Sequence, residues 1–169
     1  IYTMKLVLLS ILIIAFNSLV VYLTSIIAIH GIRKSISDSN YFLRKPFKLM
    51  FELVMWICGI TIILTGIFIK ANPDWLVISG GIGIFLVGIF SDFKKHIIIQ
   101  IAHYISAIGG FALLGLSFYF SFGNLNYTII IAVSAIITGA FANKRIWGLE
   151  LTLAVEVFAG LFFYVHLLM

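Results

Sequence analysis

Charged residues are scarce in this sequence of 169 residues: they make up 10% of it, whereas hydrophobic residues make up 63%. A soluble domain typically carries about 25% charged residues, because its surface must face water. The mean hydropathy is +1.20, and the apolar residues form long uninterrupted runs, as lipid surroundings require. The shortage of charge therefore excludes a soluble enzyme and predicts an integral membrane protein.

Cysteine and closely spaced histidines are also lacking. The single cysteine, Cys58, lies inside an apolar run, which excludes a disulfide framework and a CxxC metal motif. The histidines show no HxxxH or HExxH spacing and do not pair at matching depths, which argues against zinc and bis-histidine haem sites. We therefore predict no metal ligands, and the sequence identifies no cofactor.

The net charge of +5 and the pI near 9.4 do not indicate nucleic acid. The basic residues sit in short connections between apolar runs, where membrane orientation accounts for them. We therefore expect membrane lipid, and not nucleic acid, as the partner. A second copy of the chain, or another membrane protein, is the alternative partner.

Six apolar runs approach or reach the length of a transmembrane helix, about 20 residues. They lack the alternation of barrel strands. The first run is as long as a full span and has no small-residue cleavage site, so we expect no cleavable signal peptide. We predict an all-α fold, an integral membrane bundle of six transmembrane helices forming a single domain over 1–169. The predicted spans are 6–29, 47–69, 75–90, 97–120, 127–141 and 146–169.

The basic residues divide unevenly between the two sides of such a bundle. Of the 11 lysines and arginines, only Lys5 and Lys70 lie on the side of the termini, and the other nine lie in the first, third and fifth connections. Lysine and arginine concentrate in cytoplasmic loops. We therefore expect both termini outside, in the inner (cytoplasmic) membrane of a bacterium.

Several ionisable residues within or beside the apolar runs lie toward the side of these basic connections. Such residues are costly in lipid, so each is a candidate for a functional site. Glu52 and Glu150 lie about one turn into their spans and His103 about two turns, while Asp92 ends the third span on that side. Together with Asp38 they predict a polar pocket, open on one side of the membrane.

The serine-rich segment Ser35–Tyr41 is expected to cover this pocket. If the site is catalytic, acid–base chemistry fits, with His103 as base and Asp92 as its orienting partner. Small residues beside His103 on its helical face would let a neighbouring helix approach. Glu156 lies roughly 9 Å deeper than Glu150 along the same helix. The predicted ligand-binding residues are Ser37, Asp38, Glu52, Ser106, Glu150 and Glu156.

Each of these residues also has a purely structural interpretation. Glu52 and Glu150 can pair with a lysine or arginine at the same end of their helices, or extend to water. Asp92 can pair with Lys95, and His103 can be a hydrogen-bonded core residue. The glycines of the third run are expected to serve helix packing.

Three short motifs carry a family resemblance. The segment Ser35–Tyr41 resembles the "ISDT" segment of DRAM-type and GPI-lipid-remodelling membrane proteins, and the "SISxTxY" segment of their bacterial and phage-borne relatives. Gly88–Phe90 is similar to that family's "GxF", and His103–Ala107 with Phe111 to its "HxxxA…F". Asn40-Tyr41 replaces the glycine of eukaryotic members, which places the chain nearer the bacterial group. The resemblance implies six spans, the handling or sensing of a lipid, and the signature positions Ser37, Asp38, Asp92 and His103.

Three functions remain in competition from the sequence. The first is a membrane protein that binds or modifies a lipid or other amphiphile beneath Ser35–Tyr41. The second is a small channel or transporter component in which Glu156, with Asn17 and Thr152, lines an ion path. The third is an accessory or structural subunit that presents its glycine-rich third span to a partner.

Overall fold

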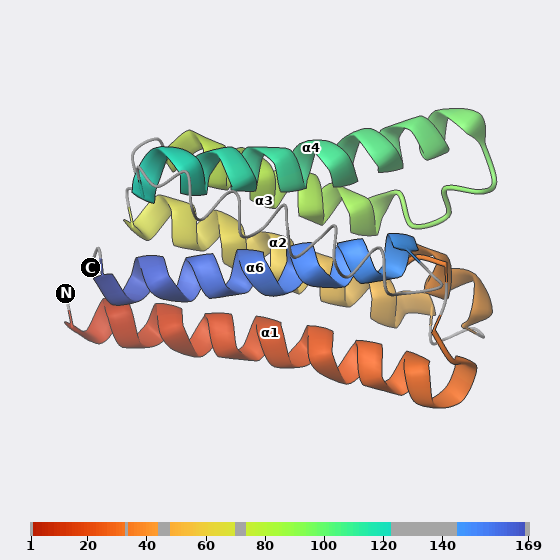
Figure 1. Cartoon of the computed structure of the whole chain (residues 1–169), viewed down its shortest axis with the longest axis horizontal. Helices are drawn as coiled ribbons and strands as arrows, with labels where there is room; N and C mark the ends of the chain where they lie inside the picture. Colours follow the sequence, from red (N-terminus) through yellow and green to blue (C-terminus); the bar gives the residue numbers. More distant parts are fainter. Residues whose placement is uncertain (1, 33, 44–47, 70–73, 123–144, 168–169) are drawn as a thin grey trace.

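The computed structural model describes residues 2–32, 34–43, 48–69, 74–122 and 145–167 (Figure 1). Within these ranges the chain forms five α-helices and one short 3-10 helix, and no strand. This confirms the all-α prediction. The elements are α1 (Tyr2–His30), η1 (Ser37–Phe42), α2 (Lys48–Ile69), α3 (Asp74–Ile89), α4 (Ile97–Phe122) and α6 (Arg145–Leu167).

The helix limits lie within four residues of the predicted spans that fall in the described part of the chain. Three helical segments are long and apolar enough to cross a membrane, namely Thr3–His30, Lys48–Ile69 and Ile97–Phe120. They confirm the character of a membrane protein. The helix α3 is apolar but shorter, with 16 residues. The predicted span 127–141 lies outside the described residues.

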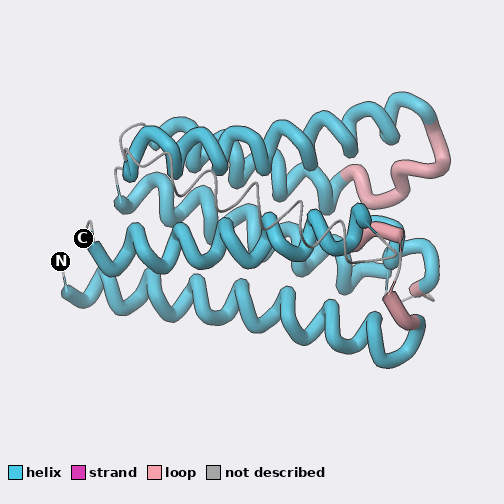
Figure 2. The backbone as a smooth tube through the Cα atoms, in the orientation of Figure 1, coloured by secondary structure: helices cyan, strands magenta, loops and turns pink. Residues whose placement is uncertain are grey.

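The helices lie side by side, and the neighbours α1 and α2, α2 and α3, and α3 and α4 run antiparallel (Figure 1). Figure 2 shows that the loops gather at the end of the bundle away from the two termini. We call this the η1 end, because it holds η1, the turn Phe90–His96 and the start of α6. The serine-rich segment Ser35–Tyr41 is thus largely helical, because η1 begins at Ser37.

Local sequence explains how α1 ends and how its inner face forms. Gly31 takes a positive φ of 69°, which glycine adopts without strain, and its N–H donates to the Ile27 carbonyl oxygen at 2.9 Å. Buried side chains recur along α1 at alternating steps of three and four residues, the spacing of a helix packed along its length. They are Leu8, Leu12, Ala15, Leu19, Tyr22 and Ile26.

Glycines bring α3 close to the helices on both sides. A Cβ on Gly81 would lie 2.9 Å from the Ile63 backbone nitrogen in α2, closer than real Cβ contacts allow. On the other face, a Cβ on Gly83 would lie 2.7 Å from Gly110 Cα and 2.8 Å from the Ser106 carbonyl oxygen in α4. The prediction that these glycines serve packing is therefore confirmed.

This packing predicts opposite effects of the same substitution at two glycines. Gly83→Ala forces two backbones apart, and we expect it to lower stability by about 1–3 kcal/mol, the usual cost of overpacking. Gly109→Ala is the control, because a Cβ there meets nothing within 4 Å. It should leave stability unchanged or raise it by up to about 1 kcal/mol through helix propensity. Thermal unfolding in mild detergent measures both, and equal effects would contradict the packing argument.

Candidate functional site

At the η1 end, α2 and the turn after α3 are joined by a partly buried polar contact. Ser91 Oγ donates a hydrogen bond to Glu52 Oε1 at 2.7 Å. The carbonyl oxygen of Ser91 accepts a hydrogen bond from Asn40 Nδ2 of η1 at 3.3 Å. Asn40 is fully buried, and its own Oδ1 has no hydrogen-bond partner among the described residues. Glu52 therefore lies in a structural network that attaches η1 to the helices beneath it.

A second buried contact attaches η1 to α1. Ser39 is fully buried, and its hydroxyl donates to the Ile36 carbonyl oxygen at 2.5 Å. Tyr22 Oη lies 2.5 Å from the same Ser39 Oγ. Because Ser39 has a single proton, which it gives to Ile36, Tyr22 is the donor in the second contact. Among the described residues, Ser39 is thus the one hydrogen-bond partner of the Tyr22 phenol.

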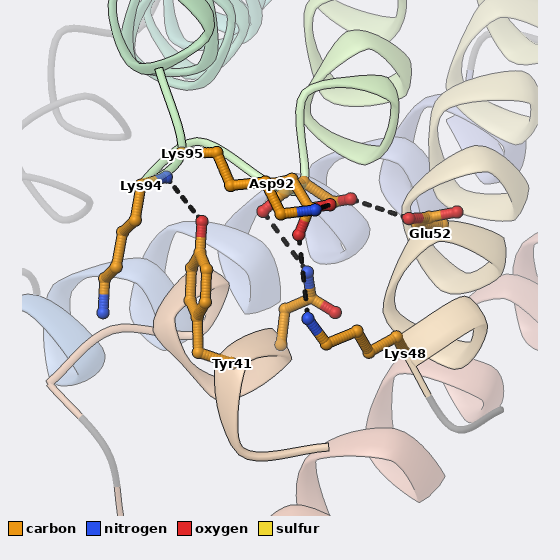
Figure 3. Close-up of polar contacts among 8 residues, drawn as sticks. Tyr41, Lys48, Glu52, Asp92, Lys94 and Lys95 are labelled. Atoms are coloured by element: carbon orange, nitrogen blue, oxygen red, sulfur yellow. Dashed lines mark hydrogen bonds and ion pairs between the residues drawn. The ribbon is translucent and has the colours of Figure 1, made fainter. Parts of the chain in front are cut away.

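Ion pairs lie on the solvent-exposed side of this network. Lys94 pairs with Asp38, and Lys95 pairs with Asp92. Lys48 Nζ lies 3.8 Å from Asp92 Oδ1, too far for a hydrogen bond (Figure 3). The hydrogen bond from Lys95 and the charges of both lysines hold the pKa of Asp92 below its ordinary value. Asp92 is therefore a carboxylate paired with lysine at neutral pH.

Aromatic rings extend the network toward α4. Tyr41 Oη accepts a hydrogen bond from the Lys94 backbone N–H at 2.5 Å, and its ring packs edge-on against Phe93 at 5.3 Å between centroids. Lys94 Nζ lies 4.4 Å from the centre of the Tyr41 ring. Partial burial raises the pKa of Tyr41 above its ordinary value, so the phenol stays protonated. Phe93 then stacks on His103, with centroids 4.3 Å apart.

His103 is 2% exposed and lies between α3 and α4. Its Nδ1 is 3.0 Å from the Phe90 carbonyl oxygen, so that nitrogen carries the proton when the ring is neutral. Asp92 contacts lysines and makes no hydrogen bond or ion pair with His103 within the described structure. The hydrogen-bonded core interpretation therefore describes His103 better than a base oriented by Asp92. Its catalytic role stays a prediction.

A cavity of about 520 Å³ lies between the helices beneath η1. Its described lining is almost wholly aliphatic and aromatic, and comes from α1, η1, α2, α3, α4 and α6. The polar residues of the lining are Ser37, Tyr104 and Glu150, together with the thiol of Cys58. Ser37 and Glu150 belong to the η1 end, and Tyr104 is the residue of the α4 lining nearest to it, so the polar side chains lie toward one end of the cavity.

Glu150 connects this cavity to η1. Its Oε2 accepts a hydrogen bond from the Ile36 backbone N–H, across 114 positions of sequence. Ile36 and Ser37 are adjacent and both border the cavity. The carboxylate thereby replaces a missing backbone partner at the start of η1, which an apolar residue could not do.

The predicted site residues thus divide into two groups. Asp38, Glu52, Asp92 and His103 belong to the network at the η1 end, whereas Ser37 and Glu150 border the cavity. Ser106 is buried where α4 meets Gly83. Glu156 is partly exposed on α6 and does not belong to the described cavity lining. No group of three metal-ligating side chains occurs among the residues that the structure describes.

Sequence reasoning missed several participants. Tyr22, Asn40 and Ser91 are buried contacts of the network, and Tyr104 borders the cavity. Ser91 and Tyr104 stand directly beside predicted residues, Asp92 and His103. Tyr22 carried no signal, because nothing distinguishes its hydroxyl from those of the serines and threonines elsewhere in the same apolar helix.

The shared contact of Tyr22 and Ser39 predicts an ordered pair of effects on stability. Tyr22→Phe removes one hydrogen bond and should cost about 1 kcal/mol. Ser39→Ala leaves the buried Tyr22 phenol without a partner and should cost more, about 1–3 kcal/mol. In the double variant the two losses should be less than additive, because the orphaned phenol is gone. Thermal unfolding of the three variants checks this, and a larger effect of Tyr22→Phe would contradict it.

Comparison with known proteins does not assign a function to these residues. The sequence matches no family model, and no curated protein or solved structure is significantly similar to it. What the site can do follows from its own chemistry: a hydrogen-bonded network that holds η1 in place, and a deep apolar cavity with a carboxylate at its end.

Proposed function

We propose that this chain is a six-span membrane protein that binds a lipid or other amphiphile, with the tail in the cavity and the headgroup beneath η1. The observation that carries the proposal is the distribution of polarity in the cavity. Ser37, Tyr104 and Glu150 lie toward the η1 end, and aliphatic and aromatic side chains line the remainder. Ligand sites of this kind combine an apolar body with a few polar groups that fix orientation.

The depth of the cavity suits a hydrocarbon tail. Its α4 lining extends from Tyr104 to Ala112, and its α6 lining from Leu149 to Phe158. At about 1.5 Å per residue these stretches cover about 12–14 Å along the helix axes. A tail of that length would replace water in contact with apolar side chains, which is favourable at about 25 cal/mol per Å² buried.

Six spans and both termini outside form part of the same proposal. The helix α4 ends at the terminal end of the bundle, whereas α6 begins at the η1 end, as an even number of crossings requires (Figure 1). Lys34, Lys48, Lys94 and Lys95 all lie at the η1 end, which supports a cytoplasmic location for it in a bacterial inner membrane. The resemblance to DRAM-type and GPI-lipid-remodelling proteins supports a lipid-related role.

Binding is better supported than chemistry or partner presentation. His103 stacks on Phe93 and bonds to Phe90, and it is not part of the described cavity lining. The buried α3 glycines contact α2 and α4, so they are not free to meet a partner. An ion path at Glu156 stays an alternative prediction, although Thr152 Oγ1 bonds to the Gly148 carbonyl oxygen of its own helix.

Filling the cavity should weaken lipid retention. Ala154 on α6 borders the cavity, and Ala154→Phe places a ring inside it. Native mass spectrometry of the wild type in mild detergent should show a retained amphiphile, and Ala154→Phe should reduce its occupancy at least about tenfold, a change of about 1.4 kcal/mol. Ala159→Phe is the matched control, because Ala159 is exposed on the same helix and outside the described lining.

Two results would overturn this proposal. One is a wild type that carries no amphiphile and takes up none on addition. The other is equal occupancy in both variants with unchanged thermal unfolding, since a folded Ala154→Phe protein that binds normally cannot use this cavity.

A further inference from the structure

We infer that the ligand of this cavity carries a primary ammonium headgroup that Glu150 binds. This inference rests on the proposed function and adds the class of headgroup to it. The charge of the cavity lining supports this headgroup. Glu150 is the one carboxylate among the described lining residues, and none of these is lysine, arginine or histidine. A headgroup in this cavity therefore meets one carboxyl group and no basic side chain from the described lining.

Three of the lysines that the structure describes at the η1 end contact aspartates outside the cavity lining. Lys94 pairs with Asp38 and Lys95 with Asp92, and their side chains are 49% and 65% exposed. Lys48 approaches Asp92 from α2. An anionic headgroup beneath η1 would thus lie next to Glu150 without a cation from the described lining. Uncompensated like charges in apolar surroundings are strongly unfavourable.

Glu150 has capacity for a further donor. Its Oε2 accepts the Ile36 N–H, which fixes the carboxylate at the η1 end of the cavity. Its Oε1 has no hydrogen-bond partner within the described part of the chain. An ionised carboxylate can accept about four hydrogen bonds. A primary ammonium has three donors, enough for Glu150 Oε1 and for the hydroxyl of the neighbouring Ser37.

The remaining acidic residues do not compete for such a headgroup. Asp38 and Asp92 are paired with lysines. Glu52 accepts a hydrogen bond from Ser91 and is not in the described lining. Glu156 is six positions from Glu150, on a different face of α6, and is not in the described lining. The geometry therefore points to Glu150 alone.

Three probes with one tail and different heads test the inference: dodecylamine, dodecanol and dodecanoate. At neutral pH the full-length wild type should bind dodecylamine at least about tenfold more tightly than dodecanoate, with dodecanol between them, because a charge-assisted hydrogen bond is about twice as strong as a neutral one. Native mass spectrometry with increasing probe concentration measures the three affinities.

Glu150→Gln should remove the preference for dodecylamine while dodecanol binding stays within about threefold of the wild type, since the tail contacts are intact. Glutamine keeps the side-chain volume and still accepts from Ile36. Asp74→Asn, the same change at the opposite end of the bundle, is the control and should keep the preference. If Glu150→Gln fails to fold, the ranking of the probes on the wild type still decides.

The outcomes separate this inference from the proposed function. Binding of all three probes without preference, lost in Ala154→Phe, would overturn the headgroup assignment and leave amphiphile binding standing. Failure of every probe would overturn both. Lipid extraction identifies the source of the amine: a copurified amine-bearing lipid that Glu150→Gln loses indicates a membrane lipid, and a bare protein that binds added dodecylamine indicates a soluble alkylamine.

Discussion

The close approach of α3 to α2 on one side and α4 on the other is the constraint on which the rest of the structure depends. Side chains are absent where the backbones meet: Gly81 lies against the α2 backbone, and Gly83 against Gly110. In lipid, where apolar burial gives little drive for helix association, such contacts provide dispersion energy. They also fix the height of α3 relative to its neighbours. The turn that follows α3 is thereby brought to the level at which η1 can bond to it.

The backbone of that turn and of η1 explains why so many polar residues gather at one end of the bundle. Non-helical backbone beside a membrane needs partners for its N–H and C=O groups. Here Ile36 N–H is satisfied by Glu150, the Ser91 carbonyl by Asn40 and the Phe90 carbonyl by His103. Polar residues that are costly in lipid thus have a structural role here. A polar residue within the membrane is a candidate for function only where such backbone contacts do not already account for it.

The sequence could predict where the helices lie along the chain, but not how each helix is rotated about its axis. Hydropathy located the described helices to within four residues, because the thickness of a bilayer sets their length. The common end of the polar residues followed from their order along antiparallel spans. Rotation about each helix axis could not be predicted. Glu52 and Glu150 both lie about one turn into their helices, yet one faces Ser91 and the other the cavity.

The distribution of charge at the η1 end links the two parts of the molecule. Lys94 and Lys95 lie on its exposed surface and pair with Asp38 and Asp92, whereas the described lining of the cavity beneath contains one carboxyl group and no basic side chain. Exposed pairs of this kind are screened by water and contribute little to stability, so their main effect is on orientation and on what approaches the membrane surface. A carboxylate inside an apolar cavity is far less screened and acts at short range. The same end of the bundle can therefore attract anionic headgroups to its surface and exclude them from its interior.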